Sequence, residues 1–153
     1  TVFNSKVTIT DVDPAISGDI VVPATLDGCD VIKIGDYAFE GCDKVTSITV
    51  PDSIPTIGRG AFKGMTALES VTLPHVGNTA SSTGTSGTFG YVFDYTSTAT
   101  EGAVNQGGYY YFIPDSIKNV KITSDATISD YAFQNMANLE SINLDASSNV
   151  TSL

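Results

Sequence analysis

The sequence predicts an α/β solenoid of about four coils, with strands on one side, short helical turns on the other and a β-rich cap at the N-terminus. Three blocks of sequence that align with one another without a gap support this prediction. In each block an Ala-Phe pair is followed by apolar residues at fixed offsets, and such self-similarity is the signature of repeat architectures. The blocks are residues 34–50, 57–73 and 128–144.

Within each block the spacing of apolar residues changes along the chain. In the first block, apolar residues over 38–48 recur at intervals of three or four, as on a helical turn, and residues 48–50 alternate as in a short strand. Strands of successive coils pair side by side, so equivalent residues stack on one another. We therefore expect Phe39, Phe62 and Phe133 to form one buried column.

The coil boundaries follow from the same alignment. All 153 residues suit a single domain, and a hydrophobic content of 41% is enough for a continuous core. The N-terminal part holds short β-like runs without an Ala-Phe pair, so it is predicted to cover the apolar face of the first coil. The predicted parts are the cap at 1–33, repeat 1 at 34–56, repeat 2 at 57–74, an irregular repeat 3 with an insertion at 75–122, repeat 4 at 123–144, and the start of a truncated coil at 145–153.

The third repeat departs from the pattern. Residues 117–122 align with the strand half of the second block, 68–73, and the long segment between them is an insertion into one coil. A degenerate helical half is predicted at 89–93. The stretch 77–88 contains only Gly, Ser, Thr, Asn and Ala, a composition typical of a flexible loop.

Aromatic residues gather in the rest of this insertion, at 89–112. Tyrosine and phenylalanine offer large apolar area with few rotatable bonds, which makes them good anchors for protein or sugar partners. We expect exposed contact residues among Tyr95, Tyr109 and Tyr111. The alternative is that these rings pack on each other and cover the solenoid where the coil is irregular.

A second candidate surface is the outer face of the strands. The predicted contact residues there are Thr49, Thr72, Lys121 and Asn143, beside a row that contains Ser47 and its equivalents. Hydroxyl and amide side chains in register can bind a glycan or an extended peptide. The alternative is a solvated sheet face without a partner.

Composition and motifs argue against several functions. The chain contains 17 Asp and Glu but only 7 Lys and Arg, so its formal net charge is −10. This negative charge disfavours nucleic acid and anionic membranes as partners. No apolar run approaches the roughly 20 residues of a membrane span, and the start of the chain lacks a signal-peptide pattern. We therefore expect a soluble body that is a mature or excised piece of a longer chain, without membrane insertion.

No catalytic, cofactor-binding or metal-binding residue is predicted, so the protein is not expected to be an enzyme. His75 is the single histidine and is interpreted as a plain loop residue. Cys29 and Cys42 lie outside any metal-binding spacing; Cys42 is predicted to be buried, and whether the two cysteines form a disulfide stays open. Asp11 and Asp13 lack the rest of a calcium loop.

The repeat blocks also resemble a known family. Val45, Ile48 and Val50 have the L-x-x-L-x-L spacing of leucine-rich repeats, and the motif Ile-Gly-Asp-Tyr-Ala-Phe-x-Gly-Cys precedes them. The whole block is similar to the BspA-like leucine-rich-repeat family of bacterial surface and secreted proteins. The lead-in at 19–23 and the Tyr-Phe-Ile-Pro sequence at 111–114 agree with that family.

This resemblance implies a right-handed leucine-rich-repeat array and a non-catalytic, extracellular or cell-surface module for binding or adhesion. Its partner is expected to be a protein of the host or matrix, and the module is expected to be a monomer or weak oligomer without cofactors. The alternatives are a structural spacer within a longer surface protein, or a carbohydrate-binding module with a glycan as partner.

Overall fold

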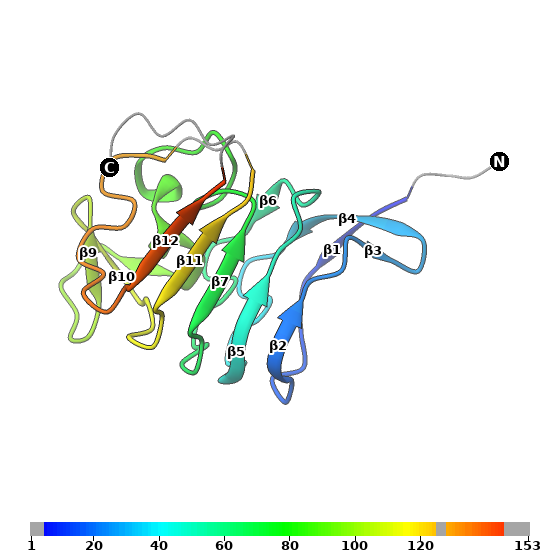
Figure 1. Ribbon diagram of the computed structural model, residues 1–153, viewed down its shortest axis with the longest axis horizontal. Helices are drawn as coiled ribbons and strands as arrows, with labels where there is room; N and C mark the ends of the chain where they lie inside the picture. Colours follow the sequence, from blue (N-terminus) through cyan, green and yellow to red (C-terminus); the bar gives the residue numbers. More distant parts are fainter. Residues whose placement is uncertain (1–4, 125–127, 146–153) are drawn as a thin grey trace.

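The main feature of the structure, a computed structural model that describes residues 5–124 and 128–145, is a sheet of five parallel strands. Figure 1 shows these strands side by side as the successive coils of a β-solenoid. Their order across the sheet is β12-β11-β7-β5-β2. The strands are β2 (Ser17–Val21), β5 (Lys44–Thr49), β7 (Ser70–Leu73), β11 (Asn119–Ile122) and β12 (Ser141–Leu144).

The register of this sheet stacks equivalent residues of the repeats. Ile48 pairs with Val71, Val71 with Val120, and Val120 with Ile142. The first three of these side chains are buried. Because side chains alternate between the two faces of a strand, the residues on either side of this row face solvent.

The N-terminal part of the chain forms a second sheet. In it β4 (Cys29–Ile34) pairs with β1 (Lys6–Ile9), β3 (Thr25–Leu26) and β6 (Thr56–Ile57). Strand β2, from the same part of the sequence, instead joins the edge of the main sheet beside β5. The N-terminal residues thus add a strand to the solenoid as well as a separate sheet.

The side of the coils away from the main sheet is built from turns, and the predicted α-helical turns are not confirmed. The described residues contain no α-helix, only the short 3-10 helices η1 (Gly84–Gly87) and η2 (Phe89–Phe93). A left-handed residue stands at each end of the Ala-Phe turn, with φ of 58° at Tyr37 and 77° at Gly41, and a right-handed helix cannot continue through such residues.

Hydrogen bonds between coils take the place of helical ones. The Phe39 amide donates to the Ala61 carbonyl at 2.7 Å, and the Phe62 amide donates to the Val92 carbonyl at 2.8 Å. The turns therefore stack as the strands do, and their backbone groups are satisfied by the neighbouring coil. The solenoid is held by hydrogen bonds along both of its long sides.

A continuous column of phenylalanine rings fills the interior, which confirms that Phe39, Phe62 and Phe133 share one core. Ring centroids lie 5.7 Å apart between Phe39 and Phe62, and 6.2 Å apart between Phe62 and Phe93. The column continues through Phe89, 5.4 Å from Phe93, and reaches Phe133 after a further 5.3 Å. The irregular coil thus supplies two rings from η2 where a regular repeat would supply one.

The insertion forms its own small antiparallel sheet, with β10 (Tyr109–Tyr111) between β8 (Tyr95–Thr96) and β9 (Val104–Gln106). The stretch 77–88, predicted to be a flexible loop, is tied to the second coil. The Asn78 side chain donates to the Ile57 carbonyl at 2.8 Å, and the Asn78 amide donates to the Ser86 carbonyl at 2.8 Å. Composition alone did not show these specific contacts.

Two predicted features fall on parts of the chain that the structure does not describe. Residues 146–153, most of the predicted start of a truncated coil, lie outside the described residues. So do residues 125–127, within predicted repeat 4.

Candidate binding surface

The outer face of the main sheet carries two rows of polar side chains in register. The structure brings all four predicted contact residues of this face into the first row: Thr49 pairs with Thr72, Thr72 with Lys121, and Lys121 with Asn143. Thr49 and Thr72 are half-buried, whereas Lys121 and Asn143 are exposed. The second row contains Ser47, Ser70, Asn119 and Ser141.

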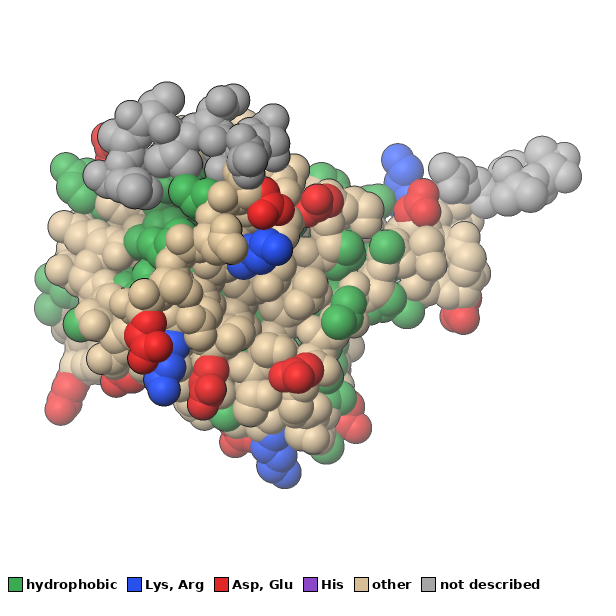
Figure 2. Space-filling model, in the orientation of Figure 1, with side chains coloured by type: hydrophobic (Ala, Val, Ile, Leu, Met, Phe, Trp, Pro, Cys, Tyr) green, Lys and Arg blue, Asp and Glu red, His purple; other side chains and the backbone are tan. Residues whose placement is uncertain are grey.

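We call these two rows the sheet face. Over β7, β11 and β12 it holds a shallow depression of about 210 Å³, lined by hydroxyl, amide and ammonium groups. Figure 2 shows that the surface over these strands is mostly uncharged, with a few acidic and basic side chains scattered on it. Small-molecule sites are usually clefts of about 300–1,000 Å³. A depression this small and open suits contact with a flat partner better than enclosure of a substrate.

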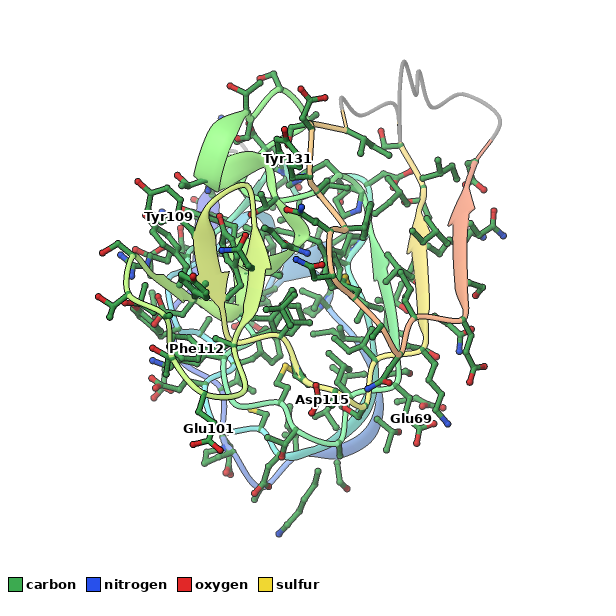
Figure 3. The ribbon with its side chains drawn as sticks, turned by 90° about the vertical axis from the view of Figure 1, so that its left-hand side faces the viewer. Glu69, Glu101, Tyr109, Phe112, Asp115 and Tyr131 are labelled. Atoms are coloured by element: carbon green, nitrogen blue, oxygen red, sulfur yellow. The ribbon has the colours of Figure 1, made fainter. Side chains whose placement is uncertain are left out.

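Charged residues border the sheet face where the strands begin. An exposed charged residue directly precedes each of the strands β7, β11 and β12. In this order the residues are Glu69, Lys118 and Glu140. Their backbones are linked in order, because the Lys118 amide donates to the Glu69 carbonyl and the Glu140 amide donates to the Lys118 carbonyl. Figure 3 shows Glu69 at this end of the sheet. The two carboxylates accept hydrogen bonds and the ammonium group donates them, so the border of the sheet face offers both acceptors and donors.

The three tyrosines predicted in the insertion differ in exposure. Tyr109 is 37% exposed, Tyr95 is half-buried and Tyr111 is completely buried. Their rings contact one another, with centroids 5.5 Å apart both between Tyr95 and Tyr109 and between Tyr95 and Tyr111. Mutual packing thus accounts for much of the aromatic cluster, and only Tyr109 presents a large part of its ring to solvent.

The burial of Tyr111 corrects its selection as a possible exposed contact residue. A Cβ atom on Gly90 would collide with the Tyr111 ring, so the absence of a side chain at Gly90 makes room for it. The Tyr111 hydroxyl donates to the Thr85 carbonyl at 3.1 Å. Burial raises the pKa of this phenol above its ordinary value. Tyr111 is a core residue of the irregular coil.

The insertion is fixed to the second coil by the carboxylate of Asp94, which directly precedes β8. Arg59 Nε lies 2.7 Å from one carboxylate oxygen, and Lys63 Nζ lies 2.9 Å from the other. Burial alone would raise the pKa of Asp94, but hydrogen bonds from Lys63, the Tyr95 backbone and Arg59 outweigh it, and the pKa is lowered. Asp94 therefore stays ionised and holds both cations.

This anchor explains why the second repeat has Arg59-Gly60 where the other blocks have Asp-Tyr. Arg59 also donates to the Tyr95 carbonyl at 2.8 Å, and its guanidinium lies 4.1 Å from the centroid of the Tyr95 ring. A Cβ atom on Gly60 would approach the Tyr37 ring to 2.5 Å, so a larger residue would have to displace this ring. The departure from the repeat pattern serves the attachment of the insertion.

Tyr131 is a candidate contact residue that the sequence interpretation did not select. It is 60% exposed and lies in the same repeat column as Tyr37, where solvent-side residues are expected. The sequence signal that could have identified Tyr131 is an aromatic residue at a solvent-side position of a repeat.

His75 is a core residue rather than the plain loop residue that the sequence indicated. It is 2% exposed, and neither ring nitrogen has a hydrogen-bond partner among the described residues. Burial lowers its pKa below the ordinary value of 6.5. The backbone groups of Pro55 and Gly77 raise the pKa of His75, but neither forms a hydrogen bond of normal geometry with the ring. They therefore offset the effect of burial only in part. The imidazole is therefore neutral at pH 7.

We expect His75 to make stability depend on pH between about 7 and 5. Because the pKa in the folded state lies below that in the unfolded state, its stabilising contribution is complete above pH 6.5 and falls as the pH drops further. Urea unfolding at pH 7, 6 and 5 should show a decrease for the wild type, and His75→Leu should remove most of it. An equally large decrease in the variant would show that other groups cause the pH dependence.

The cysteines and the N-terminal acidic residues show no ligand site. Cys29 and Cys42 are both free thiols, and Cys42 is buried as predicted. Burial raises the pKa of the Cys42 thiol. The Asp13 carboxylate accepts a hydrogen bond from the Ala15 amide at 2.9 Å, which is a turn contact. Within residues 5–124 and 128–145, no group of three or more His, Cys, Asp or Glu could hold a metal ion.

Parallel strands stacked in register, with turns behind them and a buried phenylalanine column, define a β-solenoid of the leucine-rich-repeat class. The model of the BspA type leucine rich repeat region matches residues 32–153 in six copies, and the chain belongs to this family. The six copies indicate a solenoid of about six turns, so the predicted number of about four coils is not confirmed.

A leucine rich repeat protein of T. pallidum (TpLRR), known from a crystal structure, is similar to this chain at 17% identity. The match covers 94% of this chain and 78% of that one, with a TM-score of 0.41. No curated protein matches the chain. In the described part of the chain, no helix has the length and apolar character required to cross a bilayer.

Proposed function

We propose that the protein is a non-catalytic binding and adhesion module that presents its sheet face to a protein partner outside the cell or at the cell surface. The partner is expected to be a host or matrix protein, and the module is expected to act as a monomer or weak oligomer. The observation that carries this proposal is the register of the sheet face, where polar side chains of four neighbouring strands form two uninterrupted rows.

The chemistry of the sheet face supports recognition rather than catalysis. Side chains such as Thr72 and Asn119 offer hydroxyl and amide groups, and Lys121 adds one ammonium group. A polar surface of this kind can form many hydrogen bonds with a flat partner, but it does not enclose a substrate or exclude water from it. Leucine-rich-repeat domains commonly mediate protein interactions and are typically non-catalytic, which agrees with this geometry.

The proposal can be tested by placing bulk and charge on the sheet face. The double variant Thr49→Arg, Thr72→Arg changes two adjacent positions of the first row. Binding to a panel of matrix and host-surface proteins should be measured by biolayer interferometry. For a partner that the wild type binds, we expect the double variant to bind at least about tenfold more weakly, because bulky side chains would hold the two surfaces apart.

Thr66→Arg is the matched control, since Thr66 is an exposed threonine outside the sheet face. It adds the same side chain without touching the proposed interface, and it should bind as the wild type does. Equal affinity of the double variant and the control would place the interface elsewhere, with Tyr109 as the next candidate. A folded wild type that binds no protein of the panel would favour the structural-spacer alternative.

A further inference from the structure

A groove of about 690 Å³ lies beside the irregular coil and uses none of the residues of the sheet face. Its walls come from the segment around η1, the β9–β10 hairpin and the turn before Ala132. The residues that matter for the argument are Thr85, Thr88, Tyr109, Ser129, Asp130 and Tyr131. The volume lies within the range of about 300–1,000 Å³ that small-ligand sites occupy.

Two exposed tyrosines line this groove. Tyr131 is 60% exposed, and Tyr109 is 37% exposed. Figure 3 shows both on the same side of the molecule, near the tip of the β9–β10 hairpin. The Tyr131 ring lies against Gly107 at that tip. The groove thus has aromatic surface at positions where a ligand can reach it.

Tyr131 shares its backbone conformation with Tyr37 but not the contacts of the Tyr37 side chain. Its φ is 66°, in the left-handed region that is unfavourable for an aromatic residue. Tyr37, at the equivalent position with φ of 58°, packs beside Gly60 and donates its hydroxyl to Asp94 at 3.3 Å. The Tyr131 side chain makes no hydrogen bond among the described residues, and Tyr131 is 60% exposed.

Gly60 takes this position in the second repeat with φ of 63°, so each of the three aligned repeats has a left-handed residue here. The left-handed backbone therefore belongs to the repeat turn, and what distinguishes Tyr131 is its exposed ring beside the groove.

The polar groups of the groove define what kind of ligand fits. The Thr88 hydroxyl donates to the Thr85 carbonyl and the Ser129 hydroxyl to the Gly87 carbonyl, both at 2.9 Å. The Ser129 oxygen stays available as an acceptor, because Ser129 is half-buried, whereas Thr88 is only 2% exposed. The exposed Asp130 carboxylate, which has no hydrogen-bond partner among the described residues, adds a charged acceptor.

Charge narrows the ligand class further. No Lys, Arg or His lines the groove, and the protein carries a formal net charge of −10. Phosphate, sulfate and carboxylate groups would be repelled by Asp130 and find no cation. Acceptors in the walls match the hydroxyl donors of a neutral ligand, and the apolar C–H faces of a sugar ring pack well on tyrosine.

We propose that this groove is a binding site for neutral oligosaccharides. Sugar rings stack on Tyr131 and Tyr109, and their hydroxyl groups donate to the Asp130 and Ser129 oxygens. This site is separate from the sheet face, so the protein would engage a glycan and a protein with different surfaces.

The test is isothermal titration calorimetry of the whole chain with neutral hexasaccharides of glucose and of N-acetylglucosamine, and with a sulfated oligosaccharide. We expect at least one neutral probe to bind and the sulfated probe not to bind. Tyr131→Asn should weaken binding about tenfold or more while leaving the fold intact, because asparagine tolerates the left-handed conformation. Asp130→Asn should weaken binding less, since the amide keeps one acceptor oxygen.

Tyr37→Asn is the matched control, because it makes the same change at the equivalent repeat position, away from the groove. It should bind the neutral probe as the wild type does, as should the Thr49→Arg, Thr72→Arg variant of the sheet face. Thermal unfolding of each variant confirms that it is folded. Lack of binding by every neutral probe, preference for the sulfated probe, or equal binding by folded Tyr131→Asn would overturn the proposal. So would protein binding that is lost in Tyr131→Asn while no glycan binds.

Discussion

Replacing Phe62 with alanine is expected to lower the free energy of unfolding by about 3 to 5 kcal/mol. Phe62 is completely buried and lies in the middle of the ring column, in contact with Phe39 on one side and Phe93 on the other. The coils above and below are fixed by their own backbone hydrogen bonds, so they cannot close the resulting cavity. Urea unfolding followed by circular dichroism measures the loss.

Phe133→Ala provides the comparison within the same column. Phe133 contacts Phe89 at the other end of the column and is only half-buried. Less apolar area returns to water on truncation there, so we expect a loss of about half that of Phe62→Ala. Equal losses at the two positions, or a loss below about 1 kcal/mol for Phe62→Ala, would contradict the central place of Phe62 in the core.

The column could be predicted from sequence because the repeats encode it locally. Phe39, Phe62 and Phe133 stand at one offset in three aligned blocks, and a solenoid stacks equal offsets. The rows of the sheet face follow in the same way, from the alternation of side chains along each strand. A one-dimensional pattern is sufficient wherever each contact joins equivalent residues of neighbouring coils.

The predicted helical turns are wrong because the turns behind the sheet have the same spacing of apolar residues as a helical turn has. Backbone conformation distinguishes a helical turn from the turns observed here. The sequence signal for the observed turns is the repeat position occupied by Gly41, Gly64 and Asn135. All three have positive φ, and glycine and asparagine are the residues that most readily adopt it. Tyr37, left-handed at the other end of the same turn, carries no such signal in its side chain.

Contacts without a repeat counterpart could not be predicted. The burial of Tyr111 depends on Gly90, and Asp94 finds its cations on a different coil. His75 follows a proline in what the sequence presents as a loop, yet its side chain lies in the core. The groove beside Tyr131 brings together three segments that are far apart in the chain. Insertions break the periodicity, and the information that positions them is tertiary.

Gly77→Ala is expected to lower the free energy of unfolding by about 2 to 5 kcal/mol, for two separate reasons. Gly77 has φ of 77°, and the left-handed conformation costs an ordinary residue about 1 to 2 kcal/mol. A Cβ atom there would also collide with the carbonyl oxygen of Ser86. This carbonyl accepts the hydrogen bond from the Asn78 amide, so backbone has to move, and forced shifts of this kind cost about 1 to 3 kcal/mol.

Gly41→Ala separates these two contributions. Gly41 has the same φ of 77°, but a Cβ atom there would meet nothing within 4 Å. Only the conformational cost remains, so we expect a loss of about 1 to 2 kcal/mol. The difference between the variants in urea unfolding measures how firmly the two ends of the 77–88 segment, at Gly77 and Ser86, are packed on each other. Equal losses would show that the segment moves to accommodate the added methyl group. The segment would then be the flexible loop that its composition predicts.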